Sequence, residues 1–254
     1  MRMLRVLLPW ILLLLPVLAN ARIEVLAPKL ESAKYRELAQ ELHKAGVLQE
    51  FAKGINESMR LPQKVGLRFV ECGEANAFYD SSTREISMCL ELLDTYYETL
   101  AEQYESEEEL DEAAWNAYIV VLFHEFGHAL IDVLDLPITG REEDAVDQLA
   151  AWSLIDNAEG DAAVLDAALS YYVSAEASDK EFYESDFADE HSLDSQRYYN
   201  LVCWVYGSDP DKHAHLVDEE WLPAERAERC PDEYQQIDRS WSRLLEGSAK
   251  QDQG

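Results

Sequence analysis

Basic residues are scarce in this sequence. Of 254 residues, 21 are Lys or Arg, against 51 Asp and Glu, so the formal net charge is −30. A surface this acidic repels phosphate groups, which excludes nucleic-acid binding and attachment to anionic membrane surfaces. The hydrophobic content of 48% excludes a disordered chain. The length fits one large domain or at most two small ones.

Long hydrophobic runs are also scarce. The one extended run covers residues 6–18; two arginines precede it, and Ala-Asn-Ala follows it at residues 19–21. This order is typical of a secretory signal, and 13 residues fall short of the roughly 20 that span a bilayer. We predict that residues 1–21 are a signal peptide and that the mature chain begins at Arg22. The protein would then be exported to the periplasm or the extracellular space, with no stable membrane anchor after cleavage.

The sequence has four cysteines and no CxxC pair, which excludes a zinc knuckle. In an oxidising compartment the four cysteines are expected to pair. Three connectivities exist, and proximity in the sequence favours Cys72–Cys89, closing a hairpin, and Cys203–Cys230, closing a C-terminal loop. Both are predicted to be structural disulfides.

The chain also lacks internal repeats and any linker rich in Pro, Gly and Ser. Apolar residues at helical spacing predict helices over 31–41 and 47–55, and helical patterns dominate after residue 90. Short strands are predicted at 64–71, 76–79 and 84–89, the last two around a turn at 80–82. We therefore predict one domain over residues 22–254, with a predominantly helical α+β fold and a small β-hairpin or sheet region.

The motif HExxH occupies residues 124–128. A capping box that begins at Ser106 predicts the start of the helix that carries it. On a helix His124 and His128 share one face, so both imidazoles can bind one metal ion, and Glu125 lies beside them as a candidate general base. Two ordinary histidines on a helix face are the alternative, so the neighbouring residues must decide.

Carboxylates downstream of the motif favour a metal site. Asp132 follows His128 by four residues, where it can orient a ligand imidazole through its other nitrogen. A second capping pattern, from Thr139 to Glu142, predicts a further helix. That helix would place Glu143 and Asp147 on one face, as a third ligand and a support for a histidine. Two histidines and a carboxylate form a zinc site.

The segments HEFGHALID and EDAVD resemble the gluzincin metallopeptidases, whose pattern is HExxH followed by ExxxD. The resemblance implies one zinc ion per chain, held by His124, His128 and Glu143, with Glu125 as general base and Asp147 as a support. The metzincin pattern is excluded, because Ile131 and Leu134 stand where it needs Gly and His. The interval from His128 to Glu143 is short for a gluzincin, which leaves Glu142 and Asp144 as alternative ligands.

The strand region carries a second resemblance. Asn76, Ala77, Phe78 and Tyr79 are similar to the edge segment of thermolysin-like peptidases, which pairs with an extended substrate. The resemblance implies that Asn76, Ala77 and Phe78 contact the substrate. An ordinary hairpin strand is the alternative.

Nearly the whole mature chain resembles a family of secreted bacterial proteins that are described as metallopeptidases and whose domain is formally of unknown function. The matching segments are CGEANAFYD, HEFGHALIDVLDLPITGREEDAVDQ, EHSLDSQRYYNLVCWVYGSDP and the residues around Cys230. This resemblance implies a zincin-like metallopeptidase domain.

Histidines outside the motif are the remaining candidates. Peptide hydrolysis creates an oxyanion that benefits from a second electrophile besides the metal, and His191 or Arg197 could serve. Ordinary hydrogen bonding at a helix start is the alternative for His191. His213 and His215 fall in a polar loop that we predict to be exposed, and we assign them no role.

The sequence thus predicts an exported zinc metallopeptidase that acts on peptides or proteins. Two alternatives remain: a zinc-binding protein without catalysis on a peptidase scaffold, and a structural envelope protein without metal. The intact Glu125 argues against the first, because a structural site needs no base. No feature of the sequence indicates an oligomeric state.

Overall fold

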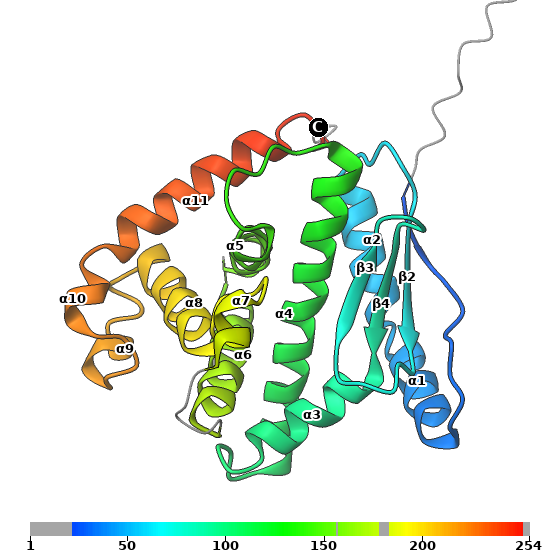
Figure 1. Ribbon diagram of the computed structural model, residues 1–254, viewed down its shortest axis with the longest axis horizontal. Helices are drawn as coiled ribbons and strands as arrows, with labels where there is room; N and C mark the ends of the chain where they lie inside the picture. The colour runs from blue at the N-terminus through cyan, green and yellow to red at the C-terminus, as the bar shows by residue number, and fades with distance from the viewer. Residues whose placement is uncertain (1–21, 156, 178–182, 251–254) are drawn as a thin grey trace, which may run out of the picture.

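The computed structural model describes residues 22–155, 157–177 and 183–250 (Figure 1). The predicted signal peptide and its cleavage site lie outside the described residues.

A four-stranded sheet forms one side of the molecule (Figure 1). Its order is β1-β2-β4-β3, with the β1–β2 and β2–β4 pairs parallel and the β3–β4 pair antiparallel. The strands are β1 (Ile23–Val25), β2 (Val65–Val70), β3 (Ala77–Asp80) and β4 (Glu85–Cys89). The three predicted strands are therefore confirmed within two residues. β1 was not predicted, because three residues are too few to show an alternating pattern.

Helices cover the sheet and form the rest of the molecule, which confirms a predominantly helical α+β fold. α1 (Ala33–Ala45) and α2 (Val47–Ser58) precede β2, and α2 packs against β1, whereas α4 (Glu107–Leu134) packs against β3 and β4. α2 and α4 lie side by side, because the Phe51 ring of α2 meets the Phe123 and Phe126 rings of α4, with centroids 5.2 and 5.5 Å apart. The remaining helices are α3 (Leu90–Leu100), α5 (Glu142–Leu154), α6 (Ala158–Ala177), α7 (Glu184–Ala188), α8 (Asp194–Ser208), α9 (His215–Asp218), α10 (Ala224–Ala227) and α11 (Cys230–Leu245). Sheet and helices share one hydrophobic core.

α4 is the central helix. The predicted N-cap is confirmed, because the Ser106 hydroxyl accepts a hydrogen bond from the Glu109 amide at 3.2 Å. The Glu109 carboxylate accepts from the Ser106 hydroxyl at 2.8 Å, rather than from the Ser106 backbone amide as in a full capping box. Among the described residues, one helix, α4, is long and apolar enough to span a membrane. However, 67% of its most apolar 18-residue stretch is buried inside the protein. It is the core helix that sheet and helical layer share.

α5 packs directly against α4 through a glycine. A Cβ atom on Gly127 would lie 2.8 Å from Val146 Cγ1, closer than real Cβ contacts, so the absent side chain lets the two helices approach. The capping box predicted from Thr139 is wrong: α5 begins at Glu142, with Arg141 as N-cap and no side-chain cap. The helix itself forms where the pattern placed it, because the packing of its apolar face outweighs the missing cap.

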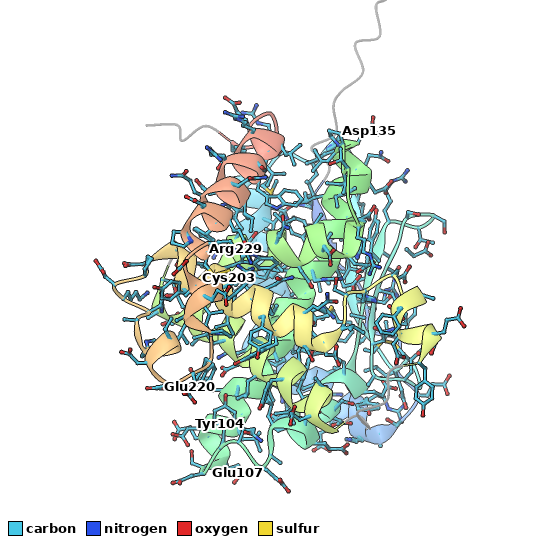
Figure 2. The ribbon with its side chains drawn as sticks, turned by 60° about the vertical axis from the view of Figure 1, so that its left-hand side comes forward. Tyr104, Glu107, Asp135, Cys203, Glu220 and Arg229 are labelled. Atoms are coloured by element: carbon cyan, nitrogen blue, oxygen red, sulfur yellow. A yellow bond between two sulfur atoms is a disulfide. The ribbon has the colours of Figure 1, made fainter. Side chains whose placement is uncertain are left out.

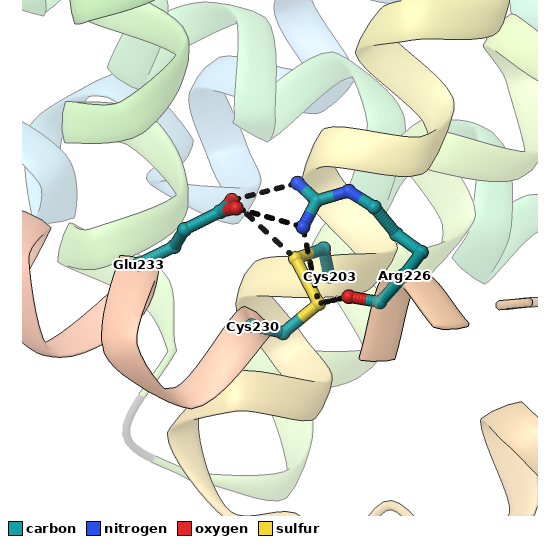
Figure 3. The surroundings of a disulfide bond; sticks show 4 residues. All are labelled: Cys203, Arg226, Cys230 and Glu233. Atoms are coloured by element: carbon teal, nitrogen blue, oxygen red, sulfur yellow. Dashed lines mark hydrogen bonds and ion pairs between the residues drawn. A yellow bond between two sulfur atoms is a disulfide. The ribbon is translucent and has the colours of Figure 1, made fainter. Parts of the chain in front are cut away.

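Both predicted disulfides are present. Cys72–Cys89 joins the segment after β2 to the end of β4, and Cys203–Cys230 joins α8 to the start of α11. Two disulfides fit an oxidising environment. Beside the second one, Arg226 donates two hydrogen bonds to Glu233 at 2.9 and 2.7 Å (Figure 3).

The prediction that His213 is exposed is wrong. His213 lies in the segment that joins α8 to α9 and is buried, 4% exposed, with Nε2 3.2 Å from Asp161 Oδ2. Asp161 lies in the first turn of α6, so tertiary packing brings the two together. A polar stretch of sequence does not reveal such a contact.

Candidate active site

A cavity of about 500 Å³ opens between β3 and α4. Four parts of the chain line it: the β3 segment from Asn76 to Ser81, the second half of α4, the start of α5, and the segment at Glu190 and His191. β3 is an outer strand of the sheet and pairs with β4 on its inner side. The predicted substrate residues Asn76, Ala77 and Phe78 therefore lie on the same cavity as the HExxH motif.

The two motif histidines project from α4 towards this cavity. Their rings meet edge to face, with centroids 5.0 Å apart, as the four-residue spacing on a helix requires. Glu125 also lines the cavity and is 7% exposed. Burial raises the pKa of Glu125, which makes its carboxylate a stronger base than an exposed glutamate.

The Glu143 carboxylate lies among three imidazoles. Glu143 Oε2 is 3.0 Å from His124 Nε2 and 3.0 Å from His191 Nε2, and Oε1 is 3.4 Å from His128 Nε2. The His191 ring lies nearly parallel to the His124 ring, with centroids 6.1 Å apart. The structure thus brings together all four of these predicted site residues.

Charge at this cluster follows from the contacts. Burial alone would lower the pKa of His124, but hydrogen bonds to Asp147 and Glu143 outweigh it and raise the pKa to about 9. Burial would likewise raise the pKa of Glu143, whereas hydrogen bonds from the three histidines hold it far below its usual range. In the metal-free protein these contacts favour the ionised carboxylate of Glu143 and the charged form of His124.

Each motif histidine has a carboxylate at its other nitrogen. His124 Nδ1 lies 2.7 Å from Asp147 Oδ1, in a buried contact, which agrees with the predicted support. His128 Nδ1 lies 2.8 Å from Glu142 Oε1, whose side chain is 50% exposed. Of the alternative third ligands, Glu142 thus contacts the outer nitrogen of His128. Asp144 instead accepts a hydrogen bond from Ser192 at 2.6 Å.

Two predicted roles are corrected. Asp132 does not contact an imidazole; it accepts a hydrogen bond from the Tyr79 hydroxyl at 2.6 Å and so links α4 to β3. Four residues after His128 the helix carries Asp132 towards the sheet, where the tyrosine meets it. Arg197 does not line the cavity; it lies behind it and donates to both oxygens of Asp147 at 2.8 and 2.7 Å.

The segment that carries His191 is attached at several points. Asp189 Oδ1 accepts from the His191 backbone amide at 2.8 Å and lies 3.2 Å from its Nδ1. Arg141 donates to the His191 carbonyl at 3.1 Å. Sequence reasoning missed Asp189, although its position two residues before a candidate histidine was a usable signal. It missed Arg141 because nothing in the sequence relates residues 50 positions apart.

The donor set fits a metal ion. Among the described residues, His124, Glu143 and His191 bring ligand atoms within 4.8 Å of one another, and His128 Nε2 adjoins the same carboxylate. Imidazole nitrogen and carboxylate oxygen are the ligands that zinc and neighbouring divalent metals prefer. Clustered imidazoles of this kind with a supporting carboxylate at the outer nitrogen are typical of metal sites.

Residues 28–245 match the family described as "Putative metallopeptidase". The match covers most of the chain, so the chain belongs to this family. No curated protein and no solved structure matches the chain.

Proposed function

We propose that the protein is an exported zinc metallopeptidase that hydrolyses peptide bonds in the cavity between β3 and α4. One observation carries the proposal: three imidazole Nε2 atoms surround the Glu143 carboxylate within 3.4 Å, and the buried Glu125 lines the same cavity. His124, His128 and Glu143 would hold one zinc ion. A zinc ion supplies Lewis acidity, which polarises a carbonyl group and makes water a better nucleophile at neutral pH.

Glu125 moves the proton. It accepts a proton from the attacking water and delivers it to the nitrogen of the leaving amine, which is general base and then general acid catalysis by one residue. Burial raises its pKa towards neutrality, so its carboxylate and carboxylic acid forms lie closer in energy.

His191 stabilises the charge that develops. The carbonyl oxygen becomes negative as water adds, and a hydrogen-bond donor on the cavity lowers the energy of that state. His191 Nε2 faces the cavity, and Asp189 holds the ring from the other side at Nδ1. The hydrogen bond to Glu143 raises the pKa of His191, so a donating imidazole is available.

The edge of β3 binds the substrate backbone. An extended peptide can add to the outer side of β3 as a further strand, with its carbonyl and amide groups paired to those of Asn76 to Phe78. Phe78 is 39% exposed and offers an apolar contact to a substrate side chain. This mode selects for extended peptides and places their backbone alongside the two motif histidines.

Glu125→Gln tests the proposal. The amide keeps the shape of the side chain and removes its basicity, so zinc content and thermal stability should stay near those of the unaltered protein. Hydrolysis of a diverse peptide library should fall by about 10²–10⁴-fold, the usual contribution of general acid–base catalysis. The control is Glu112→Gln, an exposed glutamate on the same helix, which should leave hydrolysis unchanged.

Two results would contradict the proposal. If the unaltered protein binds zinc but cleaves nothing in the library, and Glu125→Gln behaves identically, the protein is a zinc-binding scaffold without catalysis. If protein purified without chelators contains no zinc and takes up none, the structural alternative replaces it.

A further inference from the structure

Arg197 is a buried cation behind the candidate metal site. It lies near the start of α8, and its side chain is 12% exposed. Its guanidinium carbon lies 4.1 Å from the centroid of the Tyr171 ring on α6, a cation–π contact. One face of the guanidinium is thus occupied, and its nitrogens point to α5.

Arg197 contacts both carboxylate oxygens of Asp147, which lies on α5. Nε donates to Oδ2 at 2.8 Å, and Nη2 donates to Oδ1 at 2.7 Å. Such a two-point contact fixes the plane of a carboxylate as well as its position. Asp147 is 8% exposed, and a carboxylate so buried is stable only when paired.

The same carboxylate contacts a motif histidine. Asp147 Oδ1 lies 2.7 Å from His124 Nδ1, so the contacts run without a break from α8 through α5 to α4. A hydrogen bond donated by Nδ1 leaves Nε2 to face Glu143 and the cavity. The orientation of His124 therefore depends on the plane of Asp147, which Arg197 sets.

We propose that Arg197 is a positioning residue of the metal site: it holds Asp147 at both oxygens, Asp147 in turn fixes His124, and metal affinity therefore depends on an arginine that touches neither metal nor substrate. The inference rests on the proposed function, because it concerns the same site. The competing view is that Arg197 only ties α8 to α5, as any buried ion pair would.

The chain contains a matched control. Arg226 also donates two hydrogen bonds to one carboxylate, that of Glu233, at 2.9 and 2.7 Å, and the pair lies against the Cys203–Cys230 disulfide (Figure 3). Arg226→Gln removes the same kind of pair away from the histidines. An effect on metal affinity that appears for Arg197 and not for Arg226 cannot come from losing an ion pair in general.

The experiment measures zinc affinity by competition with a chromogenic chelator, and the melting temperature of the metal-free protein. Arg197→Gln should weaken zinc binding by about 10–100-fold, the usual cost of losing a partner that supports a ligand. Arg197→Lys keeps the charge but loses the two-point contact. Its zinc affinity should lie between that of Arg197→Gln and that of the unaltered protein. Arg226→Gln should leave zinc affinity within twofold of the unaltered protein.

Asp147→Asn completes the test. If Arg197 acts through Asp147, the double variant Arg197→Gln/Asp147→Asn should bind zinc as weakly as Asp147→Asn alone, so the two effects should not add. The inference is overturned if Arg197→Gln and Arg197→Lys lower the melting temperature but keep zinc affinity, or if the two effects add fully. Absence of zinc binding by the unaltered protein would overturn the proposed function itself, and this inference with it.

Discussion

Two regions of this protein contain the same kind of ion pair, an arginine bound to one carboxylate, in different surroundings. In the cavity region, Arg197 binds Asp147, and the side chains of this pair are 12% and 11% exposed. In the disulfide region, formed by the second half of α8 with α10 and α11, Arg226 binds Glu233, and the corresponding side chains are 20% and 38% exposed. Both arginines donate two hydrogen bonds to one carboxylate, so the local chemistry is alike.

The difference lies in what each carboxylate touches next. Asp147 contacts His124, which lines the cavity. Glu233 instead lies beside the Cys203–Cys230 disulfide (Figure 3). In Figure 2, the labelled Cys203 and Arg229 lie close together where α8 meets the start of α11. An ion pair therefore says little about function until its neighbours are known, and four comparisons can test this contrast between the regions.

The largest contrast is expected between Glu143→Ala and Glu233→Ala. Loss of Glu143 removes a candidate ligand and leaves three imidazoles without their common carboxylate, so zinc affinity should fall by more than the 10–100-fold that loss of a supporting partner costs. Glu233→Ala should leave affinity unchanged. Equilibrium dialysis with zinc measures both. If Asp144→Ala abolishes binding while Glu143→Ala does not, the third ligand has been misassigned.

The next contrast concerns the disulfides. Replacing Cys203 and Cys230 together by serine opens a loop with a sequence separation of 27, which in the chain-entropy view lowers the free energy of unfolding by about 3–4 kcal/mol. Denaturant unfolding measures the loss. Zinc content of the folded variant should remain one per chain, because the disulfide lies outside the cavity. A variant that keeps its stability but loses zinc would reverse the roles of the two regions.

One glycine in each region permits a close helix contact. A Cβ on Gly127 would meet the Val146 side chain at 2.8 Å, and one on Gly207 would meet the Cys230 carbonyl oxygen at 2.3 Å. Each Gly→Ala change should lower the free energy of unfolding by about 1–3 kcal/mol. The loss should be larger for Gly207→Ala, because the Cys230 backbone can move less than the Val146 side chain.

The two glycine variants should differ in metal binding. Gly127→Ala pushes α5 away from α4 and should weaken zinc affinity, since Glu143 and Asp147 lie on α5. Gly207→Ala should not affect it. Thermal unfolding and a zinc titration on the same samples separate the effects, and equal zinc affinities in both variants would argue against the α4–α5 contact as the support of the site.

The smallest contrast is in pH dependence. His124 has its pKa raised to about 9 by Asp147 and Glu143 against the effect of burial, whereas burial lowers the pKa of His213. In the metal-free protein the stabilisation from His124 is present below pH 6.5 and lost as pH rises through about 9. The contribution of His213 is present above pH 6.5 and lost as pH falls below it.

Melting temperatures between pH 5 and 10 can separate the two histidines. His124→Gln should remove part of the loss on the alkaline side, and His213→Gln part of the loss on the acidic side. If the melting temperature depends on pH in the same way in both variants and in the unaltered protein, neither histidine controls the loss of stability at alkaline or acidic pH.

Local features of the sequence predicted much of the fold. Ser106 placed the start of α4 to the residue, because an N-cap hydroxyl satisfies a backbone amide within the first turn. The strands β2, β3 and β4 followed from alternation and a turn. β1 and the true start of α5 were not foreseen, since the first is three residues long and the second has no side-chain cap.

The candidate site divides in the same way. The spacing of His124, Glu125 and His128 places them on one helix face by helix geometry alone, and the structure brings Glu143 and His191 to them. The role given to Asp132 was wrong because helix spacing says which face a residue occupies, not what packs against that face. Tyr79 comes from the sheet and takes Asp132 as its partner.

The sequence by itself determined the chemistry that is available: two histidines at the spacing of metal ligands with a glutamate between them, a large excess of acids, and cysteines close enough in the chain to pair. Only the tertiary structure decided how the groups are used. Arg197, Asp147 and His124 lie on three helices, and 50 residues separate the first two. Such contacts are set by the packing of α8, α5 and α4 against one core, where a buried charge is stable only if a partner from another element reaches it.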